Sequence, residues 1–215
     1  MMKKRIAVLI SGSGTNLQAL LDACARPDFP AEIALVLSNK ADAFGLQRAL
    51  RVGVKIAVVN HKEYPSREDF DAAMQEILLE NSIDLVCLAG FMRLLSASFV
   101  EKWSGRMINI HPSLLPAFKG LDTHARALAA GVKFVGCTVH FVVPEMDAGP
   151  IITQAVVPVN FDDDVNSLRA RVLDAEHVCY VNSLRWLAEG RLLVEGLSVK
   201  IKQVQQADNI LFNPL

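Results

Sequence analysis

The chain has 215 residues, of which 52% are hydrophobic and 21% are charged. A chain this apolar is not disordered. The 22 Lys and Arg against 23 Asp and Glu give a net charge of -1, so there is no basic surface of the kind that nucleic acids or anionic membranes attract. We therefore expect one globular domain over residues 1–215, with no nucleic acid and no membrane as a partner.

The start of the chain superficially resembles a signal peptide, because Met1–Arg5 is followed by the apolar run Ile6–Ile10. That run is shorter than the roughly 7–15 residues of a signal-peptide core. No apolar run reaches the roughly 18 residues that a membrane helix needs. We expect a buried first strand and a cytoplasmic protein.

Four cysteines occur without a C-x-x-C pair, which argues against a zinc knuckle or a thioredoxin-type motif. They are Cys24, Cys87, Cys137 and Cys179. We interpret them as reduced core thiols that pack as small hydrophobic side chains, as in a reducing compartment.

Apolar runs alternate with amphipathic stretches over the first ninety residues. The runs typical of strands buried on both faces are Ile6–Ile10, Ile33–Leu37, Val54–Val59 and Leu85–Ala89. The stretches with helical spacing are Asn16–Arg26, Ala43–Val52 and Arg67–Asn81. This alternation predicts an α/β fold of right-handed βαβ units, with a mostly parallel central sheet and helices on both faces.

The pattern changes in the second half. Strands are expected over Met107–Ile110, Phe134–Val143 and Ile151–Pro158, and a helix over Thr123–Ala130. The acidic run Asp162–Asp164 places negative charge where a second helix begins, and that helix is expected to end near Glu189. From about residue 191 we expect a tail with a hairpin over 192–204 and an extended segment.

A glycine-containing loop, Ser11-Gly-Ser-Gly-Thr-Asn16, joins the first strand to the first helix. It lacks the third glycine of the dinucleotide fingerprint and the G-K-[ST] of a P-loop. Free N–H groups at a helix start bind anions, so the loop is either a phosphate cradle or a plain tight turn. Lys40, after the second strand, is expected on the same rim and favours the cradle.

Two polar residues share one face at the end of a predicted strand. Asn109 and His111 are two positions apart and point to the same side. An amide and an imidazole can stabilise an oxyanion, and the imidazole can also move a proton. A structural histidine that caps the strand end explains the same spacing equally well.

Three further ionisable residues are less clear. Asp147 lies in a Pro/Gly-containing turn, where most acids are simply solvated. His140, on the strand before that turn, reads as a core histidine or as support for a site. Glu176 falls on the apolar stripe of the long helix, where a carboxylate needs a partner. A ligand hydroxyl and a structural arginine are equally good candidates.

Five segments together resemble the folate-dependent formyltransferases, and most specifically the phosphoribosylglycinamide formyltransferases, over residues 6 to about 190. They are Asn109-Ile-His-Pro-Ser-Leu-Leu-Pro116, the Met146-Asp-Ala-Gly-Pro150 turn, and the stretches at 11–18, 38–46 and 89–95. The resemblance implies a Rossmann-like formyltransferase fold. It also implies an enzyme of purine (IMP) biosynthesis that moves a formyl group from 10-formyltetrahydrofolate, its cosubstrate, to the amine of 5'-phosphoribosylglycinamide. It implies small-molecule partners and no metal, and leaves a homodimer open.

The resemblance also assigns roles to residues. The catalytic positions are Asn109, His111 and Asp147. The ribonucleotide positions are Gly14, Thr15, Asn16, Leu17, Gln18 and Glu176. The folate positions are Arg67, Phe91, Met92, Arg93, Leu94, Leu95, Asn109, Val142, Val143 and Asp147, with Phe91 and Val142 lining the pterin pocket.

In the expected mechanism, Asn109 and a protonated His111 stabilise the oxyanion, while Asp147, through a water, keeps His111 charged and relays the proton. Many relatives have His-Thr-His where this chain has Asp122-Thr-His124, which puts in doubt any assistance from a histidine at position 122.

Four other functions fit the sequence less well. Methionyl-tRNA formylation is expected to need an added basic domain. Formyltetrahydrofolate hydrolysis is expected to need an N-terminal regulatory domain. A nicotinamide-dependent oxidoreductase would need the missing third glycine and a ribose-binding acid. A non-catalytic binding module would have no use for Asn109, His111 and Asp147.

Overall fold

The computed structural model describes residues 3–203. The chain forms two compact units. Among the described residues, the first contains 3–109 together with Phe141–Glu145, and the second contains Ile110–His140 together with 146–203. Strand β5 (Met107–His111) includes the point at which the chain leaves the first unit. That residues 1–215 form a single domain stays a prediction.

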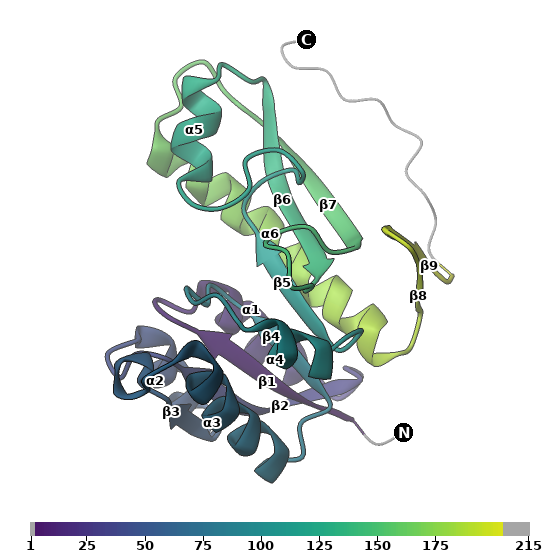
Figure 1. Ribbon diagram of the computed structural model, residues 1–215. Helices are drawn as coiled ribbons and strands as arrows, with labels where there is room; N and C mark the ends of the chain where they lie inside the picture. Colours follow the sequence, from purple (N-terminus) through teal and green to yellow (C-terminus); the bar gives the residue numbers. More distant parts are fainter. Residues whose placement is uncertain (1–2, 204–215) are drawn as a thin grey trace. The chain divides into compact units, whose positions relative to one another are not determined.

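The first unit is built on parallel strands in the order β3-β2-β1-β4-β5 (Figure 1). Its strands are β1 (Lys4–Ile10), β2 (Ala31–Ser38), β3 (Ile56–Val58) and β4 (Leu85–Leu88), with β5 joined to β4. Its helices are α1 (Thr15–Cys24), α2 (Phe44–Arg51), α3 (Arg67–Glu80) and α4 (Ala97–Lys102), with a 3-10 turn η1 (His61–Glu63). The parallel βαβ arrangement that the sequence predicts is confirmed.

The central position of β1 explains its composition. It pairs with β2 on one side and β4 on the other, and Ile6–Ile10 are fully buried. A strand covered on both faces has no solvent side, so its apolar residues run without alternation. The core of this unit brings β-strand residues such as Leu9 and Leu35 against Phe70 and Met74 of α3 and Trp103 after α4.

The second unit combines strands and two helices. Strand β6 (Phe134–Phe141) pairs antiparallel with β7 (Ile151–Pro158), β7 pairs parallel with β9 (Ser198–Ile201), and β9 pairs antiparallel with β8 (Leu192–Glu195). Helix α5 (Thr123–Ala129) is short, whereas α6 (Val165–Ala188) is long and packs along β7 (Figure 1). The predicted hairpin is confirmed over β8 and β9, and the expected extended segment lies mainly outside the described residues.

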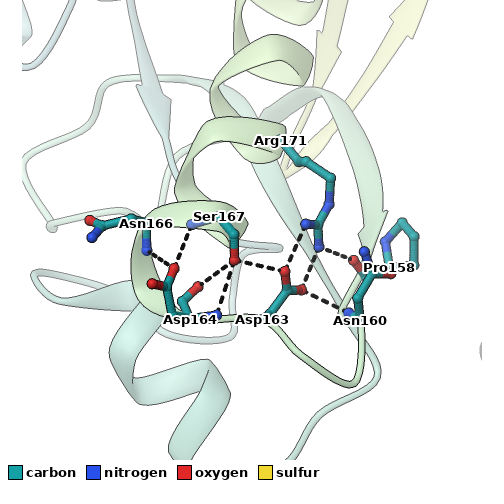
Figure 2. Close-up of polar contacts among 7 residues, drawn as sticks. All are labelled: Pro158, Asn160, Asp163, Asp164, Asn166, Ser167 and Arg171. Atoms are coloured by element: carbon teal, nitrogen blue, oxygen red, sulfur yellow. Dashed lines mark hydrogen bonds and ion pairs between the residues drawn. The ribbon is translucent and has the colours of Figure 1, made fainter.

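The acidic run before α6 begins the helix as expected. Asp164 is the N-cap, and its Oδ1 accepts from the N–H groups of Asn166 and Ser167 (Figure 2). The Ser167 hydroxyl lies 3.0 Å from the Asp164 backbone N–H, which completes a capping box. Asp163 instead forms an ion pair with Arg171 in the second turn of α6.

Some boundaries differ from the predictions. Helix α4 was not predicted, because its 6 residues span fewer than two turns and give no helical period. Strand β3 covers only Ile56–Val58 rather than Val54–Val59. Strand β6 ends at Phe141, two residues earlier than predicted, and the next N–H, of Val142, donates to the Met107 carbonyl.

Candidate functional site

The loop before α1 lines a cavity of about 190 Å³. The cavity is bounded on one side by Ser11–Asn16 and on the other by Ala89, Gly90 and Met92. Gly14 is the N-cap of α1 in the left-handed conformation, with φ of 70°, which glycine adopts without strain. Backbone N–H groups at a helix start can bind an anion there, as the cradle interpretation expects.

Hydrogen bonds join the two walls of this cavity. The Ser11 hydroxyl donates to Asn39 Oδ1 at 2.6 Å and accepts from the Met92 N–H at 2.8 Å. The Ser11 N–H donates to the Gly90 carbonyl. The loop and the segment after β4 therefore hold a fixed separation.

The other predicted ribonucleotide positions near this loop differ in exposure. Thr15 and Asn16 line the cavity, whereas Leu17 is fully buried in the core. Gln18 is half-buried, and its side chain bonds to Asp22 and Arg48. Within residues 3–203, Lys40 does not line the cavity, and the cation bonded to the loop is Arg48, which the sequence analysis missed.

The segment after β4 presents the predicted folate positions. Met92 and Leu94 are 61% and 56% exposed, which is unusual for large apolar side chains that are neighbours and suits an apolar ligand. Phe91 is half-buried and stacks on Phe70 of α3 at 6.5 Å. Arg93 and Arg67, the first residue of α3, are exposed, while Leu95, Val142 and Val143 are half-buried.

A buried carboxylate anchors the far end of this segment. Asp71 of α3 accepts from the Ser96 N–H at 2.6 Å, at the N-cap of α4. Burial raises the pKa of the Asp71 carboxyl, against the lowering effect of its bonds with Ser96. Residues 91–95 are thus held between β4 and a helix start.

The polar pair at the end of β5 occupies the positions that the sequence predicts. Asn109 is half-buried and pairs in register with Leu88 of β4. His111 is buried, and its Nε2 lies 3.1 Å from the Phe118 carbonyl oxygen. A carbonyl only accepts, so Nε2 carries the proton in this contact.

Asp147 meets His111 within the second unit. The Asp147 Oδ2 lies 3.5 Å from His111 Nδ1 and accepts from the Gly120 N–H at 2.9 Å. At 3.5 Å the carboxylate and the imidazole are in direct contact, and the participation of a water in the proton relay stays a prediction. Both ring nitrogens of His111 face acceptors, so a doubly protonated ring has a partner for each N–H.

A second imidazole contacts the same carboxylate. The His140 Nε2 lies 3.8 Å from Asp147 Oδ1, and the His140 side chain is almost fully buried. Asp147 therefore lies between two histidines that come from β5 and β6. Of the two interpretations that the sequence allowed for His140, support for the site is the one this contact favours.

The loops around this cluster contain unusual backbone conformations. Phe118, Asp122 and Asp147 have positive φ values of 53°, 55° and 52°. Non-glycine residues in this region carry strain, which proteins tolerate mainly where a site requires it. Asp122 directly precedes α5.

His124, in the first turn of α5, is neutral at pH 7. Burial lowers the pKa of its imidazole, with Arg169 contributing.

Glu176 is 7% exposed on the buried face of α6, as its place on the apolar stripe predicts. Its neighbours include the thiols of Cys137 and Cys179, and a hydrogen bond between these thiols, together with burial, raises the pKa of Cys137. All four cysteines are free and buried, so the prediction of core thiols is confirmed.

The described residues contain neither a candidate metal site nor a helix that could span a membrane. Within residues 3–203, no cluster of three His, Cys, Asp or Glu side chains could hold a metal ion. No helix in the same part of the chain has the length and hydropathy needed to cross a membrane.

Comparison with known families adds an independent finding. Residues 4–184 match the family model described as formyl transferase. The chain belongs to this family. The match includes both units of this formyl transferase, and it confirms the resemblance drawn from the sequence motifs.

Named relatives fall into two groups. The human trifunctional purine biosynthetic protein adenosine-3 is 54% identical over 188 residues, which cover 87% of this formyl transferase and 19% of the relative. The chain thus spans about a fifth of the length of such relatives. The phosphoribosylglycinamide formyltransferase of Haemophilus influenzae is 46% identical over 189 residues, covering 88% of this chain and 89% of that protein.

The fold is shared with a solved structure at high similarity. The glycinamide ribonucleotide transformylase 1 of Symbiobacterium toebii has a TM-score of 0.90 and 53% identity, covering 93% of this chain and 94% of that one. The predicted α/β formyltransferase fold is therefore confirmed.

Proposed function

We propose that this formyl transferase moves the formyl group of 10-formyltetrahydrofolate to the amine of 5'-phosphoribosylglycinamide in purine biosynthesis. The observation that carries the proposal is the His111–Asp147 contact, two residues beyond Asn109 on β5. An amide donor, an imidazole and a carboxylate are the groups that acyl transfer requires. Similarity to proteins named phosphoribosylglycinamide formyltransferase supports this choice of substrates.

In the proposed reaction, the substrate amine forms a bond with the formyl carbon, and the bond from that carbon to the folate nitrogen breaks. Asn109 and protonated His111 stabilise the negative charge that develops on the formyl oxygen. Asp147, which contacts His111, keeps the imidazole in its charged form and helps, through a water, to pass the amine proton to the departing nitrogen. One oxyanion donor contributes about 10²–10³ in rate, and a positioned acid–base group about 10²–10⁴.

Binding roles follow from the two units separately. The loop at Gly14–Asn16 holds the ribonucleotide phosphate through its N–H groups. Glu176, which the resemblance assigns to ribonucleotide binding, accepts from a ribose hydroxyl. The exposed side chains of Met92 and Leu94, together with Phe91 and Val142, which pack against the core of the same unit, provide apolar contacts for the folate ring. Arg67 and Arg93 provide charge for the folate carboxylates.

The test is to mix the purified protein with 10-formyltetrahydrofolate, with and without the ribonucleotide, and to follow folate deformylation together with formylated product. Turnover that depends on the ribonucleotide supports the proposal. Turnover without it would instead indicate a formyltetrahydrofolate hydrolase. The variant Asn109→Ala should retain the folded state and lose at least about a hundredfold in kcat.

We also propose a cytoplasmic enzyme whose partners are these small molecules, working without a metal and without nucleic acid. Whether the protein forms a homodimer is tested by sedimentation of the purified protein at several concentrations. The location is tested by fractionating cells and detecting the protein in each fraction with an antibody.

A further inference from the structure

We propose that Arg48 of α2 is a positioning residue for the ribonucleotide phosphate, acting through the loop at Ser11–Asn16. This inference rests on the proposed function, because it takes the phosphate of the substrate as the ligand of that loop. Arg48 does not line the cavity. Its effect therefore passes through the loop backbone that it holds.

Two contacts from α2 fix the loop. The Gly45 N–H donates to the Gly12 carbonyl at 3.0 Å, and Arg48 Nε donates to the Ser13 carbonyl at 2.8 Å. In a trans peptide the C=O and the following N–H point in opposite directions. The N–H groups of Ser13 and Gly14 are therefore directed away from α2.

Because Ser13 and Gly14 line the cavity and no residue of α2 does, we infer that N–H groups directed away from α2 face the cavity. Its opposite wall is Ala89, Gly90 and Met92, and no residue of α2 lines it. By binding the two carbonyls, α2 presents the two following N–H groups to an anion. A cation on the Ser13 carbonyl also polarises that peptide group, which strengthens the Gly14 N–H as a donor.

The loop packs closely on α2, and the hydrogen bonds between them require the guanidinium of an arginine. A Cβ added to Gly14 would lie 2.7 Å from the Gly45 Cα and 3.5 Å from Arg48 Cδ, so the loop lies directly on α2 and on the stem of Arg48. Arg48 Nη1 also donates to Gln18 Oε1 at 3.2 Å. The planar guanidinium thus ties Ser13 and Gln18 together, which a single ammonium cannot reproduce with the same geometry.

Helix α2 supplies a matched control. Arg51 is one turn further along, and both arginines stack on the Phe44 ring, at 5.1 Å for Arg48 and 5.6 Å for Arg51. Of these two arginines, only Arg48 has a hydrogen bond to the loop among the contacts of the described residues. Arg48→Gln and Arg51→Gln remove the same charge and the same kind of stacking, but only the first releases the loop.

The experiment compares wild type, Arg48→Gln, Arg48→Lys and Arg51→Gln with 5'-phosphoribosylglycinamide and with its dephosphorylated nucleoside. Arg48→Gln should raise KM for the phosphorylated substrate by about ten- to fiftyfold. It should leave kcat and the reaction of the nucleoside within about twofold. Arg48→Lys should recover part of the loss, and Arg51→Gln should match wild type. Equal KM values in Arg48→Gln and wild type, or equal losses in Arg48→Gln and Arg51→Gln, overturn the inference.

A calorimetric titration with inorganic phosphate separates the two proposals. If wild type does not turn over the ribonucleotide, the proposed function fails, but the titration still tests Arg48. Weaker phosphate binding by Arg48→Gln than by Arg51→Gln supports its role. Equal binding by the two variants, or no binding by wild type, overturns it.

Discussion

The His111 Nδ1 lies 3.5 Å from Asp147 Oδ2, although 35 residues separate the two in the chain. The contact joins the end of β5 to a turn in which Asp147 takes a left-handed conformation. Asp147 also accepts from the Gly120 N–H, so its carboxylate is fixed from a second direction. The carboxylate of Asp147 therefore holds the imidazole of His111 in place, in addition to the packing around the ring.

Replacing Asp147 by asparagine should lower kcat by at least about a hundredfold, because the neutral amide no longer stabilises a charged imidazole at His111. The fold should be unaffected, since asparagine tolerates a positive φ and its oxygen can still accept from Gly120. Steady-state kinetics and the melting temperature check both points. A variant with near-full kcat would show that Asp147 has no part in proton transfer.

His140 should matter less than His111. Its Nε2 is 3.8 Å from the other oxygen of Asp147, so it supports the carboxylate rather than the reacting atoms. We expect His140→Phe to lower kcat by about threefold to thirtyfold with little change in either KM, and His140→Gln, which keeps an N–H donor, to recover most of the activity. If His140→Phe and His140→Gln lose equally, the polar contact between His140 and Asp147 does not contribute to activity.

Much of the fold could be predicted from the sequence because the central strands β1 and β4 are buried on both faces and leave unbroken apolar runs. Helix α4 escaped because its 6 residues are too few to show a period. The tail hairpin was predictable from Gly196 between two β-like runs. Observed element boundaries differ from the predicted ones where a single long-range hydrogen bond ends a strand, as with the bond from the Val142 N–H to the Met107 carbonyl.

The site was predictable only in part. Spacing alone put Asn109 and His111 on one face, but the approach of Asp147 and His140 depends on tertiary contacts, and Asp147 came from the resemblance. Arg48 was missed because one arginine on an amphipathic helix has the same pattern as a solvated surface residue. Its nearest signal was Gly45 in the first turn of α2, where a Cβ would lie 2.4 Å from Ile10 Cδ1, a mark of close backbone approach.

The ion pair before α6 should make stability depend on pH. The bond with Arg171 lowers the pKa of Asp163 well below its usual range, and the Asp163 side chain is only 3% exposed. A lowered pKa contributes stability above the unfolded value near 4, and this contribution is lost as pH falls below it. Asp163→Asn should therefore destabilise the protein by about 1–2 kcal/mol at pH 7.

Denaturant titrations of wild type and Asp163→Asn from pH 7 to pH 3 check this dependence, and their difference should shrink as the pH approaches 3. The neighbouring exposed carboxylate, replaced in Asp162→Asn, serves as the control and should have little effect at any pH. A constant difference across the range would mean that the Asp163 charge does not contribute.

Gly136 on β6 should be intolerant of any side chain. An added Cβ would lie 1.8 Å from the Ala155 carbonyl oxygen on β7 and 2.9 Å from Leu114 Cδ2. The paired strand cannot move without breaking its ladder, so Gly136→Ala should cost about 2–4 kcal/mol. The displaced Leu114 belongs to the loop after His111, and Leu115 in that loop donates to Thr138 of β6, so kcat should fall as well.

Thermal unfolding compares Gly136→Ala with Gly12→Ala, whose Cβ would meet nothing within 4 Å. Equal melting temperatures for these two variants would show that β6 and β7 can separate enough to admit a methyl group.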